Sequence, residues 1–229
     1  MLTSAAICPA PPLLARELTG ADPVAPDLRR ACLEATAALV ADGPDLIVVV
    51  GAAPETRVWP SNGKLDLTAY GPGLATPPGG PPVPLALGLG GRLLDEAGYA
   101  GPRQLQSVSE TEPVAACAAL GARLASSAGR VALLAMADGS ARRGLKAPGY
   151  LDGRSIPFDS EVERAVRAGD LAALLALDAE LARELMATGR SSWQVLAAAM
   201  NGQRPATEIR YCDDPFGVAY LVASLHPGG

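Results

Sequence analysis

The densest group of chemically capable side chains follows a short apolar run in the second half of the chain. It consists of Asp138, Ser140, Arg142, Arg143 and Lys146. Guanidinium groups pair with carboxylates and phosphates, and a Gly-Ser turn after a strand can present backbone N–H groups to an anion. The cluster therefore predicts an anion-binding or charge-stabilising site, with Asp138 as a candidate acid or base. The alternative is a solvated turn, because polar turns after strands are common.

A second candidate carboxylate is Glu55, which follows another apolar run and precedes Arg57. A carboxylate at the end of a strand can act as a base where burial raises its pKa. An exposed ion pair between Glu55 and Arg57 explains the same two residues equally well.

Histidine and cysteine offer little for metal or nucleophile chemistry. The one histidine is His226, and its place before Pro-Gly-Gly predicts a tail that frays. No serine lies in a Gly-x-Ser-x-Gly elbow, which argues against a serine hydrolase. The sequence predicts no metal and no cofactor. The cysteines lack Cys-x-x-Cys spacing and are expected to be buried thiols rather than zinc ligands or disulfides: Cys8, Cys32, Cys117 and Cys212.

The elements that must position these residues alternate between strand and helix. Residues 2–8 and 46–50 are short apolar runs typical of buried strands. Between them Pro26 begins an amphipathic helix that ends before Gly43. This order predicts a parallel pair of strands joined by a right-handed crossover. Ligands of such sheets usually lie at the carboxyl ends of the strands, where the polar turn 137–143 is expected.

The remaining segments continue the alternation. The Gly- and Pro-rich stretch 59–84 predicts a long ordered loop over the sheet edge, with 60–84 as a candidate lid. Strands are expected at 104–109, 131–136, 208–212 and 218–224. Helices are expected at 85–97, 112–126 behind a Thr111 cap, 159–168, 171–177, 179–187 and 191–200.

Length and composition indicate one globular domain over residues 1–229. A hydrophobic content of 49% supports an α/β fold with a central, mostly parallel sheet and helices on both faces. The net charge of −5 gives no basic surface for nucleic acid, and no polybasic run suggests a membrane surface. The N-terminus lacks the basic segment of a signal peptide, so a cytoplasmic location is expected. The expected partner is a small-molecule ligand or another protein subunit, including a second copy in a homo-oligomer.

Two segments near the N-terminus resemble the class III extradiol ring-cleavage dioxygenases, the LigB-like superfamily that also includes the Memo proteins. Residues 8–14, Cys-Pro-Ala-Pro-Pro-Leu-Leu, are similar to the Pro-His-x-Pro opening of that family, whose histidine is an iron ligand. Ala10 stands at that position. Residues 48–54 are similar to the strand end that supplies the second histidine ligand. Ala53 stands there, or Ala52 if the register shifts by one residue.

The resemblance continues through the second half of the chain. Residues 138–142, Asp-Gly-Ser-Ala-Arg, are similar to the Asp-x-Ser-His turn whose histidine acts as acid or base, and Ala141 stands at that position. The segments 147–150, 157–159 and 215–220 also follow the family's pattern. The resemblance implies an α/β fold, and the alanines imply that iron-dependent ring cleavage is lost, because a non-haem iron site needs two imidazoles and a carboxylate.

The resulting hypothesis is a metal-free descendant of this scaffold that binds a small molecule or anion without catalysis. Its pocket would be lined by Glu55, Asp138, Ser140, Arg142 and Arg143. One alternative is an enzyme with metal-independent acid–base chemistry that uses Asp138 or Glu55 as the base and an arginine to stabilise negative charge. Another is a non-catalytic subunit that scaffolds a partner.

Overall fold

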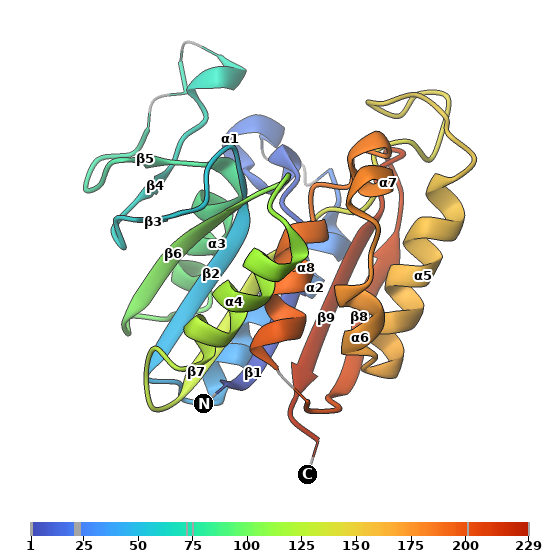
Figure 1. The fold of residues 1–229 in the computed structure, drawn as a ribbon. Coiled ribbons are helices and arrows are strands. Elements are labelled where there is room, and N and C mark those ends of the chain that lie inside the picture. The colour runs from blue at the N-terminus through green and yellow to red at the C-terminus, as the bar shows by residue number, and fades with distance from the viewer. Residues whose placement is uncertain (1, 21–23, 72, 75, 201, 229) are drawn as a thin grey trace.

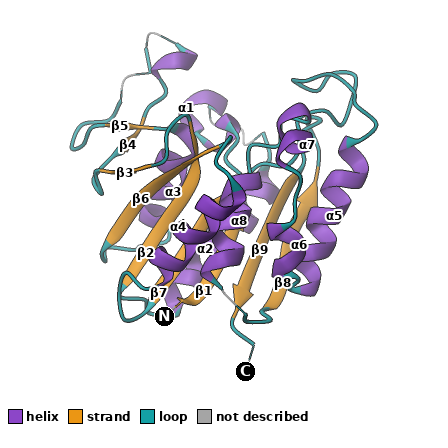
Figure 2. Cartoon of the chain, viewed as in Figure 1, coloured by secondary structure: helices purple, strands orange, loops and turns teal. Residues whose placement is uncertain are grey.

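A twisted seven-stranded sheet forms the middle layer of the molecule, with helices on both of its faces (Figures 1 and 2). The computed structural model describes residues 2–20, 24–71, 73, 74, 76–200 and 202–228. The expected α/β class with a mostly parallel central sheet is confirmed. In spatial order the strands are β3 (Arg57–Trp59), β6 (Arg103–Ser109), β2 (Leu46–Ala53), β7 (Val131–Met136), β1 (Leu2–Cys8), β9 (Tyr220–His226) and β8 (Ala206–Asp213).

The four central strands run parallel and supply the buried backbone of the sheet. β7 lies between β1 and β2 and pairs with both of them. The predicted direct pairing of the first two strands is therefore wrong, although they do run parallel. Every residue of β7 is buried, because helices cover both faces of this strand. β3, β9 and β8 extend the two edges through antiparallel pairs.

The helices divide between the two faces. The apolar positions of α2 (Pro26–Ala41) and α3 (Leu85–Glu96) form one core with the sheet, and those of α4 (Val114–Ala125), α5 (Ser155–Ala168) and α8 (Arg190–Ala199) form the other. The short helices are α1 (Arg16–Thr19), α6 (Leu171–Leu175) and α7 (Ala179–Glu184), with the 3₁₀ turns η1 (Pro12–Leu14) and η2 (Thr68–Tyr70).

Several predicted boundaries are wrong for identifiable reasons. α4 begins at Val114 behind Pro113 without a side-chain cap, and Thr111 instead bonds to Ser109. α5 begins four residues earlier than expected, because Pro157 lies in its first turn, where the missing N–H has no intrahelical partner to lose. β2 continues to Ala53, three residues beyond the predicted end, since its last residues still pair with β6.

The Gly- and Pro-rich stretch does not cover the carboxyl ends of the central strands. It contains the two-stranded sheet of β4 (Lys64–Leu65) and β5 (Pro82–Val83), which packs against α3. A Cβ added to Gly88 of α3 would lie 2.5 Å from the Cα of Leu65, so glycine at this position allows the close approach. The stretch lies beside the β6 edge of the sheet (Figure 1), and its described residues 60–71, 73, 74 and 76–84 do not line the cavity at the strand ends.

Two further expectations are corrected by the strands at the C-terminal side. His226 is the last residue of β9, in register with Ala206, and its Nδ1 lies 3.5 Å from an Asp42 carboxylate oxygen. It is not part of a frayed tail. Cys212 on β8 is exposed, whereas the other three cysteines are buried as predicted. Among the residues that the structure describes, no helix has both the length and the apolar character needed to cross a membrane.

Candidate functional site

A cavity of about 200 Å³ lies at the carboxyl ends of β1, β2 and β7. Its apolar wall comes from these strand ends and from the first residues of α3. Its polar wall comes from three loops that follow β6, β7 and α7. The residues that matter for its chemistry are Ala10, Ala52, Glu110, Met136, Asp138 and Thr188. The cavity thus occupies the place where open α/β sheets usually bind ligands.

Asp138 is the central ionisable group of this cavity. Its Oδ1 accepts a 2.8 Å hydrogen bond from the backbone N–H of Ala10, which joins the loops after β1 and β7. Burial raises the pKa of Asp138 to about 6, and the bond from Ala10 opposes the shift only in part. The carboxylate in turn contributes, after burial, to the raised pKa of Tyr220. Asp138 is therefore a carboxyl group that changes charge just below neutral pH.

Glu110 supplies a second carboxyl group from the loop after β6. It lines the cavity and is exposed to solvent. Partial desolvation raises its pKa, and the charge of the nearby Arg190 opposes this rise only in part. Arg190 is 2% exposed, and its guanidinium is hydrogen-bonded to the backbone of this loop. It donates hydrogen bonds to the backbone carbonyls of Glu110 and Glu112 and, at 2.8 Å, to the side chain of Gln194. A buried guanidinium thus fixes the loop that carries Glu110.

Thr188 completes the polar wall from the segment that precedes α8. The next residue, Gly189, donates a 2.9 Å hydrogen bond to the carbonyl of Asp138. A Cβ on Gly189 would lie 2.6 Å from that same oxygen, so only glycine allows the two loops to meet here. Sequence reasoning missed Glu110, Thr188 and Arg190. The position of Glu110 directly after a parallel strand was a usable signal, whereas nothing local marks the other two.

Ser140 and Arg143 belong to a second network, outside the lining of this cavity. Ser140 is buried and donates from its hydroxyl to Asp159 over 2.5 Å, while its backbone N–H donates to the other carboxylate oxygen over 2.9 Å. Arg143 pairs with Asp214 and lies 3.4 Å from Asp159. Burial raises the pKa of Asp159, and these hydrogen bonds and the Arg143 charge oppose the rise. These bonds attach the turn that follows β7 to Asp159 of α5. The charge of Arg143 is balanced by Asp159 and Asp214.

The other predicted site residues lie outside the cavity. Arg142 is partly buried, and its Nε has no hydrogen-bond partner among the described residues. Lys146 is exposed on the loop beyond. The side chain of Glu55 is 77% exposed, with a 4.0 Å ion pair to Arg57, whose guanidinium lies 3.6 Å from the centre of the Trp59 ring. The exposed ion pair is thus the arrangement found at Glu55.

The alanines named by the resemblance, with Ala52 as the alternative to Ala53, do not share one surface. Ala10 and Ala52 line the cavity, whereas Ala53 and Ala141 are buried outside it. Successive residues of a strand face opposite sides, so Ala52 is the position of β2 that faces this space. In the part of the chain described by the structure, no three side chains of His, Cys, Asp or Glu are grouped so that they could hold a metal ion. Two carboxyl groups without an imidazole do not fit the iron site of the resembled family.

Comparison with known proteins identifies the fold without a family or an activity. No family model and no curated protein matches the sequence. The crystal structure of an uncharacterized protein from Escherichia coli K12 is similar, with a TM-score of 0.56 and 15% sequence identity over 97% of this chain and 99% of that one. At this identity the similarity supports a common fold over the whole chain.

Proposed function

We propose that this chain is a metal-free, LigB-like α/β protein that binds a small molecule in the cavity at the strand ends. The observation that carries the proposal is the pair of carboxyl groups, Asp138 and Glu110, beside the Thr188 hydroxyl in a cavity with an apolar wall. Convergent polar groups in an otherwise apolar cavity are typical of ligand sites. Binding without iron follows from the alanines at the positions that the resemblance assigns to histidine.

The lining favours a ligand with hydrogen-bond donors over an anion. Both ionisable groups that line the cavity are acids, and an ionised carboxylate only accepts hydrogen bonds. None of the predicted cations lines this cavity, and Arg143 is already paired with Asp159 and Asp214. A volume of about 200 Å³ suits a ligand smaller than a typical drug. A single aromatic ring with hydroxyl groups, such as catechol, meets these conditions.

Calorimetric titration with catechol under nitrogen tests this assignment. We expect saturable binding at pH 7.5, and binding weakened by about ten- to a hundredfold in Asp138→Asn, since a hydrogen bond to a charged acceptor contributes roughly 1.5–3 kcal/mol. The matched ligand 1,2-dimethoxybenzene has no donors and should not bind measurably. Equal affinity of both compounds, or of wild type and Asp138→Asn, would remove the basis of the proposal.

Metal analysis of protein purified without chelators provides the second test. We expect no stoichiometric iron or zinc and no ring-cleavage product when ferrous iron and oxygen are supplied with catechol. Stoichiometric metal that is lost in Asp138→Asn would contradict metal-free binding.

A second candidate function is metal-independent acid–base catalysis. It is favoured by the pKa of Asp138 near 6, because a general base is most effective when its pKa lies close to the working pH. This reading requires turnover of a bound hydroxyaromatic or carbonyl compound that falls with the protonation of Asp138. If the protein binds a ligand but shows no turnover in a broad substrate screen, catalysis is excluded and the binding function remains.

A role as a non-catalytic subunit rests on a different surface. Large apolar side chains are exposed on the loop that follows β7, which lies at the same edge of the sheet as the cavity. Tyr150 is 63% exposed and Leu145 is 65% exposed, with Leu151 and Ile156 nearby in sequence. Analytical ultracentrifugation of wild type and Tyr150→Ser tests whether this surface assembles copies of the chain.

A further inference from the structure

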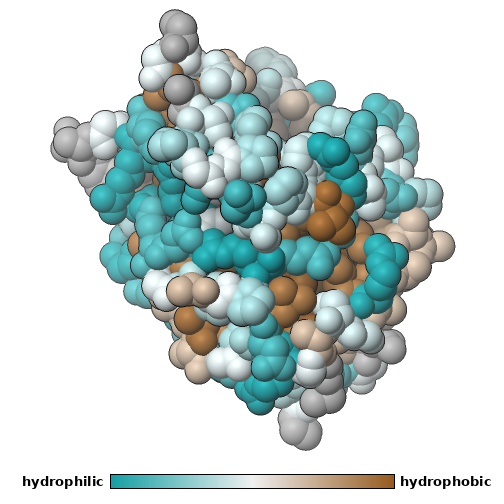
Figure 3. Space-filling model, turned by 90° about the vertical axis from the view of Figure 1, so that its left-hand side faces the viewer, coloured by the Kyte–Doolittle hydropathy of each residue, from teal (hydrophilic) through white to brown (hydrophobic). Residues whose placement is uncertain are grey.

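A second and larger cavity, of about 520 Å³, lies at the opposite end of β6 from the strand-end site. One wall is formed by residues 61–65 of the Gly- and Pro-rich stretch, and the other by the C-terminal half of α3 and the start of β6. Figure 3 looks onto the side of the molecule that carries this stretch, and that face is largely hydrophilic, with hydrophobic residues gathered in smaller areas. The volume lies in the range of small-molecule sites.

The charge of this cavity is opposite to that of the chain. Of the described residues that line it, three are cationic, Lys64, Arg92 and Arg103, and one is a carboxylate, Asp95. Arg92 is also paired with Glu17 outside the lining, at 2.5 and 2.7 Å. Including Glu17, three cations face two carboxylates, in a protein with a net charge of −5. An excess of positive charge therefore remains in the hollow.

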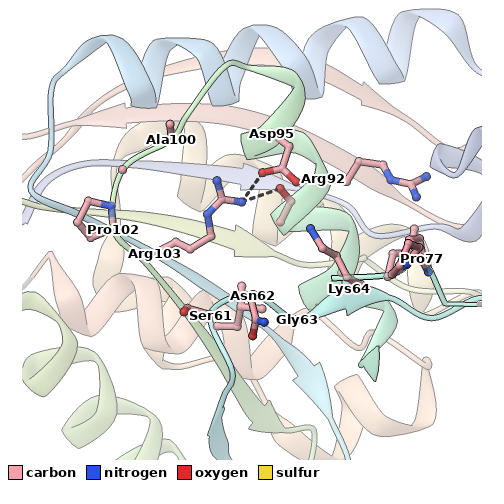
Figure 4. Close-up of a pocket in the computed structure, with 16 residues that line it drawn as sticks. Ser61, Asn62, Gly63, Lys64, Pro77, Arg92, Asp95, Ala100, Pro102 and Arg103 are labelled. Atoms are coloured by element: carbon pink, nitrogen blue, oxygen red, sulfur yellow. Dashed lines mark hydrogen bonds and ion pairs between the residues drawn. The ribbon is translucent and has the colours of Figure 1, made fainter. Parts of the chain in front are cut away.

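Lys64 differs from the two arginines in having no side-chain partner among the described residues. Its backbone is fixed in β4, where its N–H donates a 2.8 Å hydrogen bond to the carbonyl of Pro81. Among the residues with described positions, its amino group has neither a hydrogen bond nor an ion pair. Figure 4 shows this amino group and the Arg103 guanidinium pointing into the same hollow from facing sides.

The Arg103 guanidinium is held in a fixed orientation. Its guanidinium donates to the Asp95 carboxylate at 2.6 Å, to the Gly91 carbonyl at 3.2 Å and to the Tyr99 carbonyl at 2.6 Å. These bonds come from α3 and from the turn that follows it, so the guanidinium is oriented before any ligand arrives. Preorganised donors bind with a smaller loss of conformational entropy.

We propose that this cavity binds the phosphate group of a small molecule, at a site independent of the strand-end cavity. Lys64 supplies the unpaired charge, and Arg103, whose own charge is balanced by Asp95, supplies an oriented guanidinium whose Nε–H takes no part in the bonds above. These donors come from different elements and approach from facing sides. A tetrahedral phosphate accepts hydrogen bonds from several directions, whereas a carboxylate accepts them mainly in one plane, so the arrangement favours phosphate.

Isothermal titration with pyrophosphate at low ionic strength tests the proposal. We expect saturable binding that weakens as sodium chloride is added, because the interaction is between partly exposed charges. Lys64→Gln should weaken binding at least about tenfold, and Lys64→Arg should restore most of it. The matched control is Lys146→Gln, which removes the only other lysine and should leave the affinity unchanged. Thermal melting of each variant checks that it is folded.

The presence of only two lysines allows a direct readout at the site. Reductive ¹³C-methylation keeps the charge of the amino groups and gives one dimethyl-lysine signal each for Lys64 and Lys146, assigned with the arginine variants. Pyrophosphate should shift the Lys64 signal and not the Lys146 signal. Catechol binding at the other cavity should be the same in Lys64→Gln and wild type, which separates the two proposals.

Three results would overturn the assignment. The first is no pyrophosphate binding at millimolar concentration, and the second is unchanged affinity in Lys64→Gln. The third is equally tight binding of citrate, whose charge is similar but whose acceptors are carboxylates, because this would make the cavity a general anion patch.

Discussion

Replacing Asp138 by asparagine should change the pH dependence of stability in a predictable direction. The pKa of Asp138 rises from 3.8 to about 6 on folding, mainly because burial disfavours its ionised form. Its neutral form is therefore the stable one, and ionisation costs folding free energy. Wild type bears no such cost below about pH 4, loses stability as the pH rises from about 4 to 6, and bears the full cost above about pH 6.

The size of the effect follows from the same two pKa values. A rise from 3.8 to about 6 corresponds to about 3 kcal/mol. Asp138 lines a cavity that admits some solvent, so we expect roughly 2–3 kcal/mol. Asparagine is always neutral and can still accept the Ala10 hydrogen bond through its amide oxygen. The free energy of unfolding of Asp138→Asn, relative to that of wild type, should therefore rise by this amount as the pH is raised from about 4 to about 7.5.

Urea unfolding of both proteins across this pH range measures the difference directly. Thr188→Val is the matched control, because it alters the same cavity without removing a group that binds a proton. Its effect on the free energy of unfolding should not vary with pH. If the difference in the free energy of unfolding between wild type and Asp138→Asn does not change with pH, the assignment of a raised pKa is refuted. If Asp138→Asn becomes relatively more stable as the pH falls, the pKa of Asp138 is lowered on folding rather than raised.

Two further substitutions and one thiol-modification assay test the packing of the fold. Arg190→Met should destabilise the protein by about 3 kcal/mol in urea unfolding, because it leaves the Glu110 and Glu112 carbonyls without their donor. Gly121→Ala should lower the stability by about 2 kcal/mol, despite the better helix propensity of alanine, because the new Cβ would lie 2.3 Å from a backbone oxygen of α8. Ellman's reagent should modify only Cys212 in the native protein, because this residue is exposed. The reaction should be slow, because partial desolvation of the thiol and the nearby Glu163 raise the pKa of Cys212 to about 11. Rapid modification of several thiols would contradict the burial of the other three.

The sequence alone was sufficient for the fold class and for most of the elements. Alternation of short apolar runs with amphipathic segments is produced by burial itself, so the strand at 2–8, the helix that begins at Pro26 and the apolar run at 131–136 could be assigned locally. The polar turn predicted at 137–143 does follow β7. Asp138 reached the cavity because its position after a parallel strand decides its location.

Only the tertiary structure decided which of the candidate residues share a site. Ser140 and Arg143 turn toward Asp159 on α5, a helix whose contact with this turn has no local signature. Glu55 lies beyond the end of β2 and faces solvent, whereas Thr188 enters the cavity from a distant loop. Local patterns record which residues are buried, but the partner of a polar side chain depends on contacts between segments far apart in the chain. For that reason the sequence predicted the sheet, and the three-dimensional packing brought Asp138, Glu110 and Thr188 together in one cavity at its edge.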